Sequence, residues 1–260
     1  MKTCFISLAL LMMFGTNAWA ARGSSGSIGM EESAMVSNGQ GISSPSFWNA
    51  LISQNPAGLN FNQTTKLQIG AGQYNTKEQF GSAGILGGSS ILSGGTEFQK
   101  SKSSQGVLNS GLAVRLAPIS TSVGVSSHYT IKGSSTFDAG LLIDLSNRIR
   151  FGFMVPHFTD TVNTFAGGLT YAMDASVDLV VDADYNTSSR AGVVKPGVTF
   201  RTSMFQASAA YGLFYTGNFT SLIQDGFTGG LGIRLADSLL ISYEYRGIPE
   251  HRLGLTLRFN

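Results

Sequence analysis

Apolar and polar residues alternate along most of this chain from residue 62 onward. In the stretch 175–185, Val177, Leu179 and Val181 share one face, while Asp178 and Asp182 share the other. An alternation of period two predicts a β-strand with one face in apolar surroundings, because successive side chains point to opposite sides of a sheet. The pattern recurs between turn residues and predicts about twelve strands: 64–74, 107–117, 119–131, 135–146, 148–157, 163–173, 175–185, 191–202, 204–215, 226–236, 238–246 and 250–259.

The connections between these strands alternate in length. Short joints lie near Pro118, Ser146, Met173, Thr202 and Asp237, and the joints between them are mostly longer: 75–106, 158–162, 186–190, 216–225 and 247–249. Outer-membrane barrels have short periplasmic turns and longer external loops, whereas a soluble β-sandwich has no reason to alternate in this phase. The pattern therefore predicts an all-β, antiparallel transmembrane β-barrel with an even strand number and both ends in the periplasm.

One long joint leaves the strand count open. Residues 75–106 contain the Gly/Ser-rich run "SAGILGGSSILSGG". We predict that this segment forms an external cap; the alternative is that it hides two further strands, which would raise the count to fourteen.

Composition supports a barrel in a membrane. Charged residues are only 12% of the chain, glycines number 33 and the mean hydropathy is +0.11, whereas about a quarter of the residues of a typical soluble domain are charged. No apolar run after residue 20 is long enough for a membrane helix, but a barrel needs only alternate apolar residues. The formal net charge of +2 is too small to indicate a nucleic-acid partner.

The first twenty residues read as a secretory signal peptide. They combine Lys2, an apolar stretch from Phe5 to Phe14 and the small-x-small site Ala18-Trp19-Ala20. Cys4, the only cysteine, lies ahead of the apolar stretch, so the mature protein is expected to have no disulfide. We predict export to the bacterial outer membrane.

Residues 21–61 differ in kind, because they lack a strand period. One short helix is predicted, with Ser44 as N-cap, Pro45 at the first helical position and an end before Pro56. A segment of this length ahead of a barrel must lie in the lumen or below it. The predicted organisation is a signal peptide at 1–20, an N-terminal plug at 21–61 and a transmembrane barrel at 62–260.

The run "GMEESAMVSNGQGISSPSFWNALISQNPAGLNF" resembles the N-terminal region of FadL-type outer-membrane transporters, in which an Asn-Pro-Ala tripeptide precedes the first strand. Asn55, Pro56 and Ala57 hold that place here. The resemblance implies a barrel that is plugged by its own N-terminal segment and transports hydrophobic compounds such as long-chain fatty acids. This chain is shorter than typical members, which have fourteen strands and long external loops.

Four apolar side chains in the predicted plug helix are candidates for a substrate pocket. The alternative is that they only pack the helix against the barrel wall. These residues are Phe47, Trp48, Leu51 and Ile52.

Charged residues on the predicted inner face are a second set of candidates. They could select permeant ions, or they could form an internal salt-bridge network. These residues are Arg115, Arg150, Arg234, Arg246, Asp178, Asp182 and Glu244.

No motif indicates an enzyme, since G-x-S-x-G, H-E-x-x-H and a phosphate-binding glycine loop are all missing from the sequence. We expect no catalytic residues, metal or cofactor. Three hypotheses follow: a FadL-like transporter of hydrophobic compounds, a general porin for small solutes, and a non-transporting structural or assembly partner.

The end of the chain, "RLGLTLRFN", predicts a closing strand that pairs with residues 64–74. Its apolar face is expected to contact lipid, and the barrel assembly machinery is thought to read a terminal strand of this kind. The expected partners are therefore outer-membrane lipid, this machinery and hydrophobic small molecules. The apolar face consists of Leu253, Leu255, Leu257 and Phe259.

Overall fold

A computed structural model describes most of the chain from Asn55 onward. The described residues are 55–61, 64–73, 78–103, 106–116, 119–131, 133, 135–159, 164–214, 226–246 and 250–259. The predicted signal peptide and plug helix, with Phe47, Trp48, Leu51 and Ile52, lie outside these residues. Within the described part of the chain, no helix has the length and apolar character needed to cross a membrane.

The described chain forms one short 3₁₀ helix, η1 (Pro56–Phe61), followed by fourteen β-strands. The strands are β1 (Thr65–Gln73), β2 (Gln79–Gly88), β3 (Leu92–Ser101), β4 (Val107–Leu116), β5 (Thr121–Thr130), β6 (Ser135–Asp144), β7 (Ile149–Val155), β8 (Thr164–Ala172), β9 (Val177–Asn186), β10 (Ala191–Arg201), β11 (Phe205–Phe214), β12 (Gly226–Ala236), β13 (Leu239–Arg246) and β14 (Glu250–Phe259).

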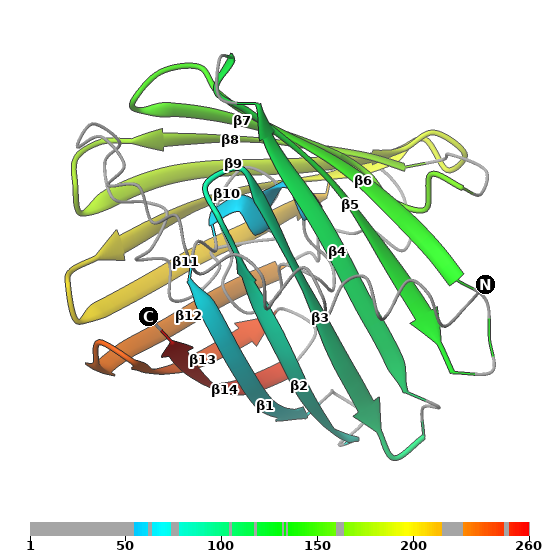
Figure 1. Cartoon of the computed structure of the whole chain (residues 1–260). Helices are drawn as coiled ribbons and strands as arrows, with labels where there is room; N and C mark the ends of the chain where they lie inside the picture. The colour runs from blue at the N-terminus through cyan, green and yellow to red at the C-terminus, as the bar shows by residue number, and fades with distance from the viewer. Residues whose placement is uncertain are drawn as a thin grey trace.

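These strands close into a single antiparallel barrel in which each strand pairs with its neighbours in sequence. β1 and β14, the first and last strands, lie side by side and complete the ring (Figure 1). Their register runs from Thr65 opposite Phe259 to Gln73 opposite His251. The predicted pairing of the last strand with the first is therefore confirmed, and no sheet edge is left open.

The two faces of the barrel have opposite chemistry, as β14 illustrates. Leu253 and Phe259 point outward and are 58% and 52% exposed, whereas Arg252 and Thr256 point inward and are 5% and 1% exposed. An apolar exterior with a polar, charged interior is the reverse of a soluble protein and is the arrangement of a barrel in lipid.

The strand count of twelve was wrong, and so was the predicted cap. Residues 75–106 contain β2 and β3, which bring the count to fourteen. Glycines and serines hide the period in both strands, and two large apolar side chains, Phe80 and Leu86, are buried on the inner face. The alternation of apolar and polar residues on which the prediction depended is therefore missing there.

The two ends of the barrel differ. At one end, called here the terminal end, β1 begins, β14 finishes, and the turns range from two residues (237–238) to four (145–148). At the opposite end, called here the loop end, connections range from three residues (247–249) to eleven (215–225).

Candidate functional site

The Asn-Pro-Ala turn lies inside the barrel and is bound to its wall. Asn55 is 1% exposed, and its side-chain Nδ2 donates to the carbonyl oxygens of Leu141 (2.8 Å) and Phe153 (3.1 Å). These two acceptors lie opposite each other on β6 and β7. One side chain thus attaches the end of the N-terminal segment to two strands of the wall.

The same asparagine also shapes the turn. Asn55 Oδ1 accepts a hydrogen bond from the Ala57 amide (3.1 Å), and the Asn55 carbonyl accepts one from the Gly58 amide (2.9 Å). An Asn side chain that bonds to the backbone two residues on, followed by a proline with fixed φ, favours a tight turn. Ala57 and Leu59 are fully buried beyond it.

Two glycines on the wall make room for this turn. Gly124 on β5 and Gly140 on β6 lie opposite each other. A Cβ atom on Gly140 would lie 2.8 Å from Pro56 Cδ, and one on Gly124 would lie 2.5 Å from the Ala57 amide nitrogen. Any side chain at either position would displace the turn, so the wall is shaped to receive it.

Glycine also predominates at mid-height on the inner face. It occupies an inner position near the middle of eleven of the fourteen strands, at Gly70, Gly84, Gly95, Gly111, Gly124, Gly140, Gly152, Gly168, Gly197, Gly230 and Gly254. A layer with so few side chains widens the lumen at the level of the turn.

Charges gather at the terminal end of the inner face. Six cations and two carboxylates, a net formal charge of +4, occupy the last inner-facing position of eight strands. This set, called here the terminal charge ring, consists of Lys66, Arg115, Asp144, Arg150, Asp178, Arg201, Arg234 and Arg258.

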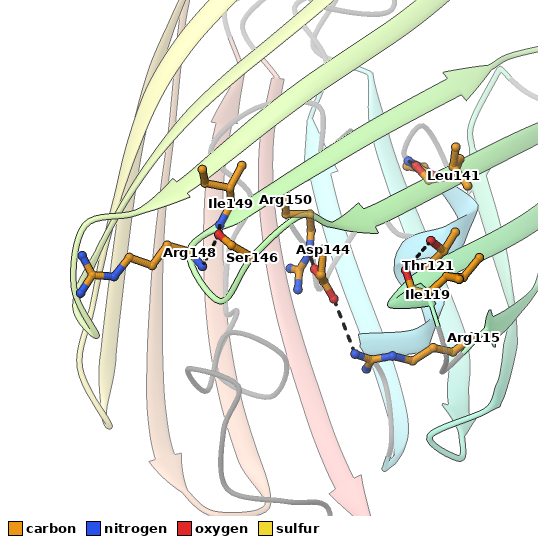
Figure 2. Close-up of polar contacts among 10 residues, drawn as sticks. Arg115, Ile119, Thr121, Leu141, Asp144, Ser146, Arg148, Ile149 and Arg150 are labelled. Atoms are coloured by element: carbon orange, nitrogen blue, oxygen red, sulfur yellow. Dashed lines mark hydrogen bonds and ion pairs between the residues drawn. The ribbon is translucent and has the colours of Figure 1, made fainter.

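Ion pairs connect part of this ring. Arg150 Nε lies 2.6 Å from Asp144 Oδ1, and Arg115 Nη2 lies 3.5 Å from Asp144 Oδ2. Figure 2 shows Asp144 between these two arginines, while Arg148 in the adjacent turn extends away from them. Arg201 donates through Nη2 to Asp178, and its buried Nε has no hydrogen-bond partner within the described residues.

The other half of the lumen has the opposite charge. From mid-height to the loop end, six inner carboxylates outnumber Lys195 and Arg252, the inner cations whose side chains the structure describes there. The carboxylates are Glu97, Asp138, Asp182, Asp184, Glu244 and Glu250. Lys195 and Arg252 are buried among them, so the lumen has a clear axial polarity of charge.

Arg252 is the centre of one cluster in this acidic half. Its Nε lies 2.5 Å from Glu250 Oε1, and its guanidinium carbon lies 5.2 Å from the centre of the Phe80 ring. It also interacts electrostatically with buried Glu97. Phe80 therefore lies in the lumen.

The sequence-predicted charges are distributed over both halves. Arg150, Asp178, Asp182 and Glu244 are buried on the inner face, and Arg115 is 25% exposed at its side chain. Arg234 is at the terminal end of β12, and Arg246 lies opposite Glu250 in the register, although its side chain is not among the described ones.

The sequence did not indicate a chain of polar contacts at His128. His128 Nε2 lies 2.7 Å from Asp138 Oδ2, and His128 Nδ1 lies 2.8 Å from Asn109 Oδ1. Asp138 also accepts a hydrogen bond from the His157 amide (2.9 Å). The only signal in the sequence was that the side chains of Asn109, His128 and Asp138 have inner-facing positions on β4, β5 and β6.

A closed antiparallel barrel with a lipid-compatible exterior, a charged lumen and an internal turn defines the class of outer-membrane-type β-barrels. The structure is similar to the toluene transporter TbuX of Ralstonia pickettii, with a TM-score of 0.63 at 10% identity over 89% of this chain and 99% of that one.

Two further solved structures have the same overall fold. The Pseudomonas putida toluene transporter TodX matches with a TM-score of 0.60 at 10% identity over 89% of this chain and 99% of that one. The Acinetobacter baumannii outer membrane protein Omp33 matches with a TM-score of 0.56 at 11% identity over 76% of this chain and 98% of that one. No family model and no curated protein matches the sequence. At these identities the likeness concerns the fold alone.

Proposed function

We propose that this protein is a bacterial outer-membrane barrel that transports hydrophobic compounds such as long-chain fatty acids. The observation that carries the proposal is the Asn-Pro-Ala turn, which is attached by Asn55 to the inside of the barrel wall. A turn that fills part of the lumen obstructs a wide aqueous pore. It is compatible with passage of a lipophilic molecule that needs a small desolvating site rather than a water-filled channel.

Two further observations support this proposal. The resemblance of residues 29–61 to FadL-type transporters and the likeness in fold to two proteins described as toluene transporters agree on the type of cargo. The terminal end, which holds both chain ends of the barrel, would then face the periplasm and the loop end the outside.

Uptake in whole cells tests the proposal. A strain without this protein should take up labelled oleate or toluene more slowly, and the full chain should restore the rate. Deletion of residues 21–61 tests the plug, with Asn55→Ala as a second variant that leaves the chain length unchanged. Unchanged uptake of both compounds in the knockout would overturn the proposal.

A second function, a general porin for small polar solutes, is favoured by the number of charges in the lumen. It predicts steady ion conductance of the full chain in planar bilayers and restored uptake of small sugars. The transporter predicts low conductance that rises when Asn55 is replaced.

A further inference from the structure

We propose that the terminal charge ring binds the anionic head group of the transported compound, so that the protein prefers hydrophobic anions to neutral hydrocarbons. This inference rests on the proposed function and names its substrate class. The ring contains six cations and two carboxylates at one level of the lumen.

The ring has cationic capacity beyond its internal pairs. Asp144 interacts with two arginines, Arg115 and Arg150, and Asp178 is paired with Arg201. The buried Nε of Arg201 has no hydrogen-bond partner among the described residues, and a carboxylate is a strong acceptor for such a donor. An added anion would therefore find a positive potential as well as an available N–H group.

The adjoining turns do not cancel this charge. They contribute Arg148, Asp174 and Asp237, all of which are exposed to solvent. Asp174 Oδ1 already accepts hydrogen bonds from the backbone amides of Ser176 and Val177. Exposed turn charges are screened by water and salt much more strongly than charges inside a low-dielectric wall.

The opposite half of the lumen gives the bound molecule an orientation. Its excess of carboxylates disfavours an anion there, so the head group is stable only at the terminal end. Next to the ring lies an inner layer without charges. Its Leu86, Ala113 and Leu142 are covered by the turn, and its open part combines Val180 with uncharged Thr and Ser side chains. The tail of the molecule would meet no charge at this level. A carboxylic acid would cross the acidic half most easily in its protonated form and ionise at the ring, releasing its proton to water.

The test compares two probes on the purified full chain in detergent: a fluorescent long-chain carboxylic acid and the alcohol of the same length. Arg115→Gln combined with Arg234→Gln lowers the ring charge by two and leaves each ring carboxylate with one arginine. The matched control, Arg148→Gln with Lys102→Gln, removes the same charge from exposed positions outside the ring.

The unmodified protein should bind the acid more tightly than the alcohol, and high salt should reduce this preference. The ring variant should raise the dissociation constant for the acid roughly tenfold without changing that for the alcohol, and the control should change neither. Equal affinity for acid and alcohol, or the same loss in the control, would overturn the inference. Failure to bind either probe, together with unchanged uptake in the knockout, would instead overturn the proposed function.

Discussion

The fit between the Asn-Pro-Ala turn and the glycine pair on β5 and β6 gives a quantitative prediction. Gly140→Ala adds one methyl group, which would lie 2.8 Å from Pro56 Cδ and 2.9 Å from Asn55 Cγ. Both distances are well inside van der Waals contact, so the turn has to leave its position. Three hydrogen bonds of the Asn55 side chain are then lost, to Leu141, Phe153 and Ala57.

The size of the effect follows from these bonds. At about 1 kcal/mol for each hydrogen bond, the seated turn loses about 3 kcal/mol, which raises the population of the displaced state roughly 100-fold. Displacement exposes Leu59, which is fully buried against Leu86 and Ala113. A cysteine at position 59 therefore reports on the displaced state.

The assay is the rate of maleimide labelling of Leu59→Cys in a Cys4→Ser background, so that the chain has one thiol. Gly140→Ala should accelerate labelling roughly 100-fold over the same protein with glycine, provided that labelling follows the displaced population. Gly167→Ala is the matched control, because its Cβ would have only an ordinary contact of 3.8 Å with the Gly152 carbonyl oxygen. Equal labelling rates in the Gly140 and Gly167 variants would refute the reasoning.

Three other outcomes are expected. Hydrogen bonds from the Ser101 hydroxyl and from Ser103 hold the pKa of Glu78, in the loop before β2, below its usual value of 4.5. The carboxylate therefore stabilises this loop at neutral pH, and the stabilisation is lost as the pH falls through the lowered pKa. Limited proteolysis at neutral pH should cut the Glu78→Gln variant faster than the unmodified protein. In strong acid the two proteins should be cut at the same rate. Arg252→Gln leaves two buried glutamates without this cation and should lower the free energy of unfolding by roughly 3–5 kcal/mol in urea titrations; a loss under 1 kcal/mol would show that the pairing matters little. Leu255→Arg places a charge on the lipid face near mid-height and should cost about 2–4 kcal/mol in lipid vesicles, more than an arginine near either rim; no dependence on depth would contradict the assigned outer face.

Much of the wall could be predicted from the pattern of residues alone. The stretch 250–259 was predicted with the bounds that β14 has, and 175–185 differs from β9 by two residues at one end and one at the other. Strands with an apolar outer face and a charged inner face are easy to recognise, because lipid selects apolar residues and the lumen selects polar ones. β2 and β3 were not predicted, because glycine and serine are acceptable on either face and because Phe80 is buried on the inner face.

The contacts of the candidate site could not be predicted in the same way. Alternation assigns Asp138 and His128 to the inner face, but their 2.7 Å contact depends on the register between β5 and β6. The Asn55 acceptors are backbone carbonyls, which have no side-chain signal in the sequence. Likewise, the sequence assigns each charge of the terminal ring to the inner face of its strand. That these charges lie at the same height in the barrel depends on where each of the fourteen strands ends.

The attachment of Asn55 also has a consequence for the order in which this molecule can assemble. Its two acceptors lie 86 and 98 residues further along the chain, on strands that face each other only after β6 and β7 have paired. β1 obtains its second neighbour later still, when β14 arrives 185 residues after Thr65. Asn55 and β1 are thus among the parts of the chain whose final contacts depend on the formation of later strands. A chain that stops before β7 lacks one of the two backbone carbonyls that bind the Asn55 side chain.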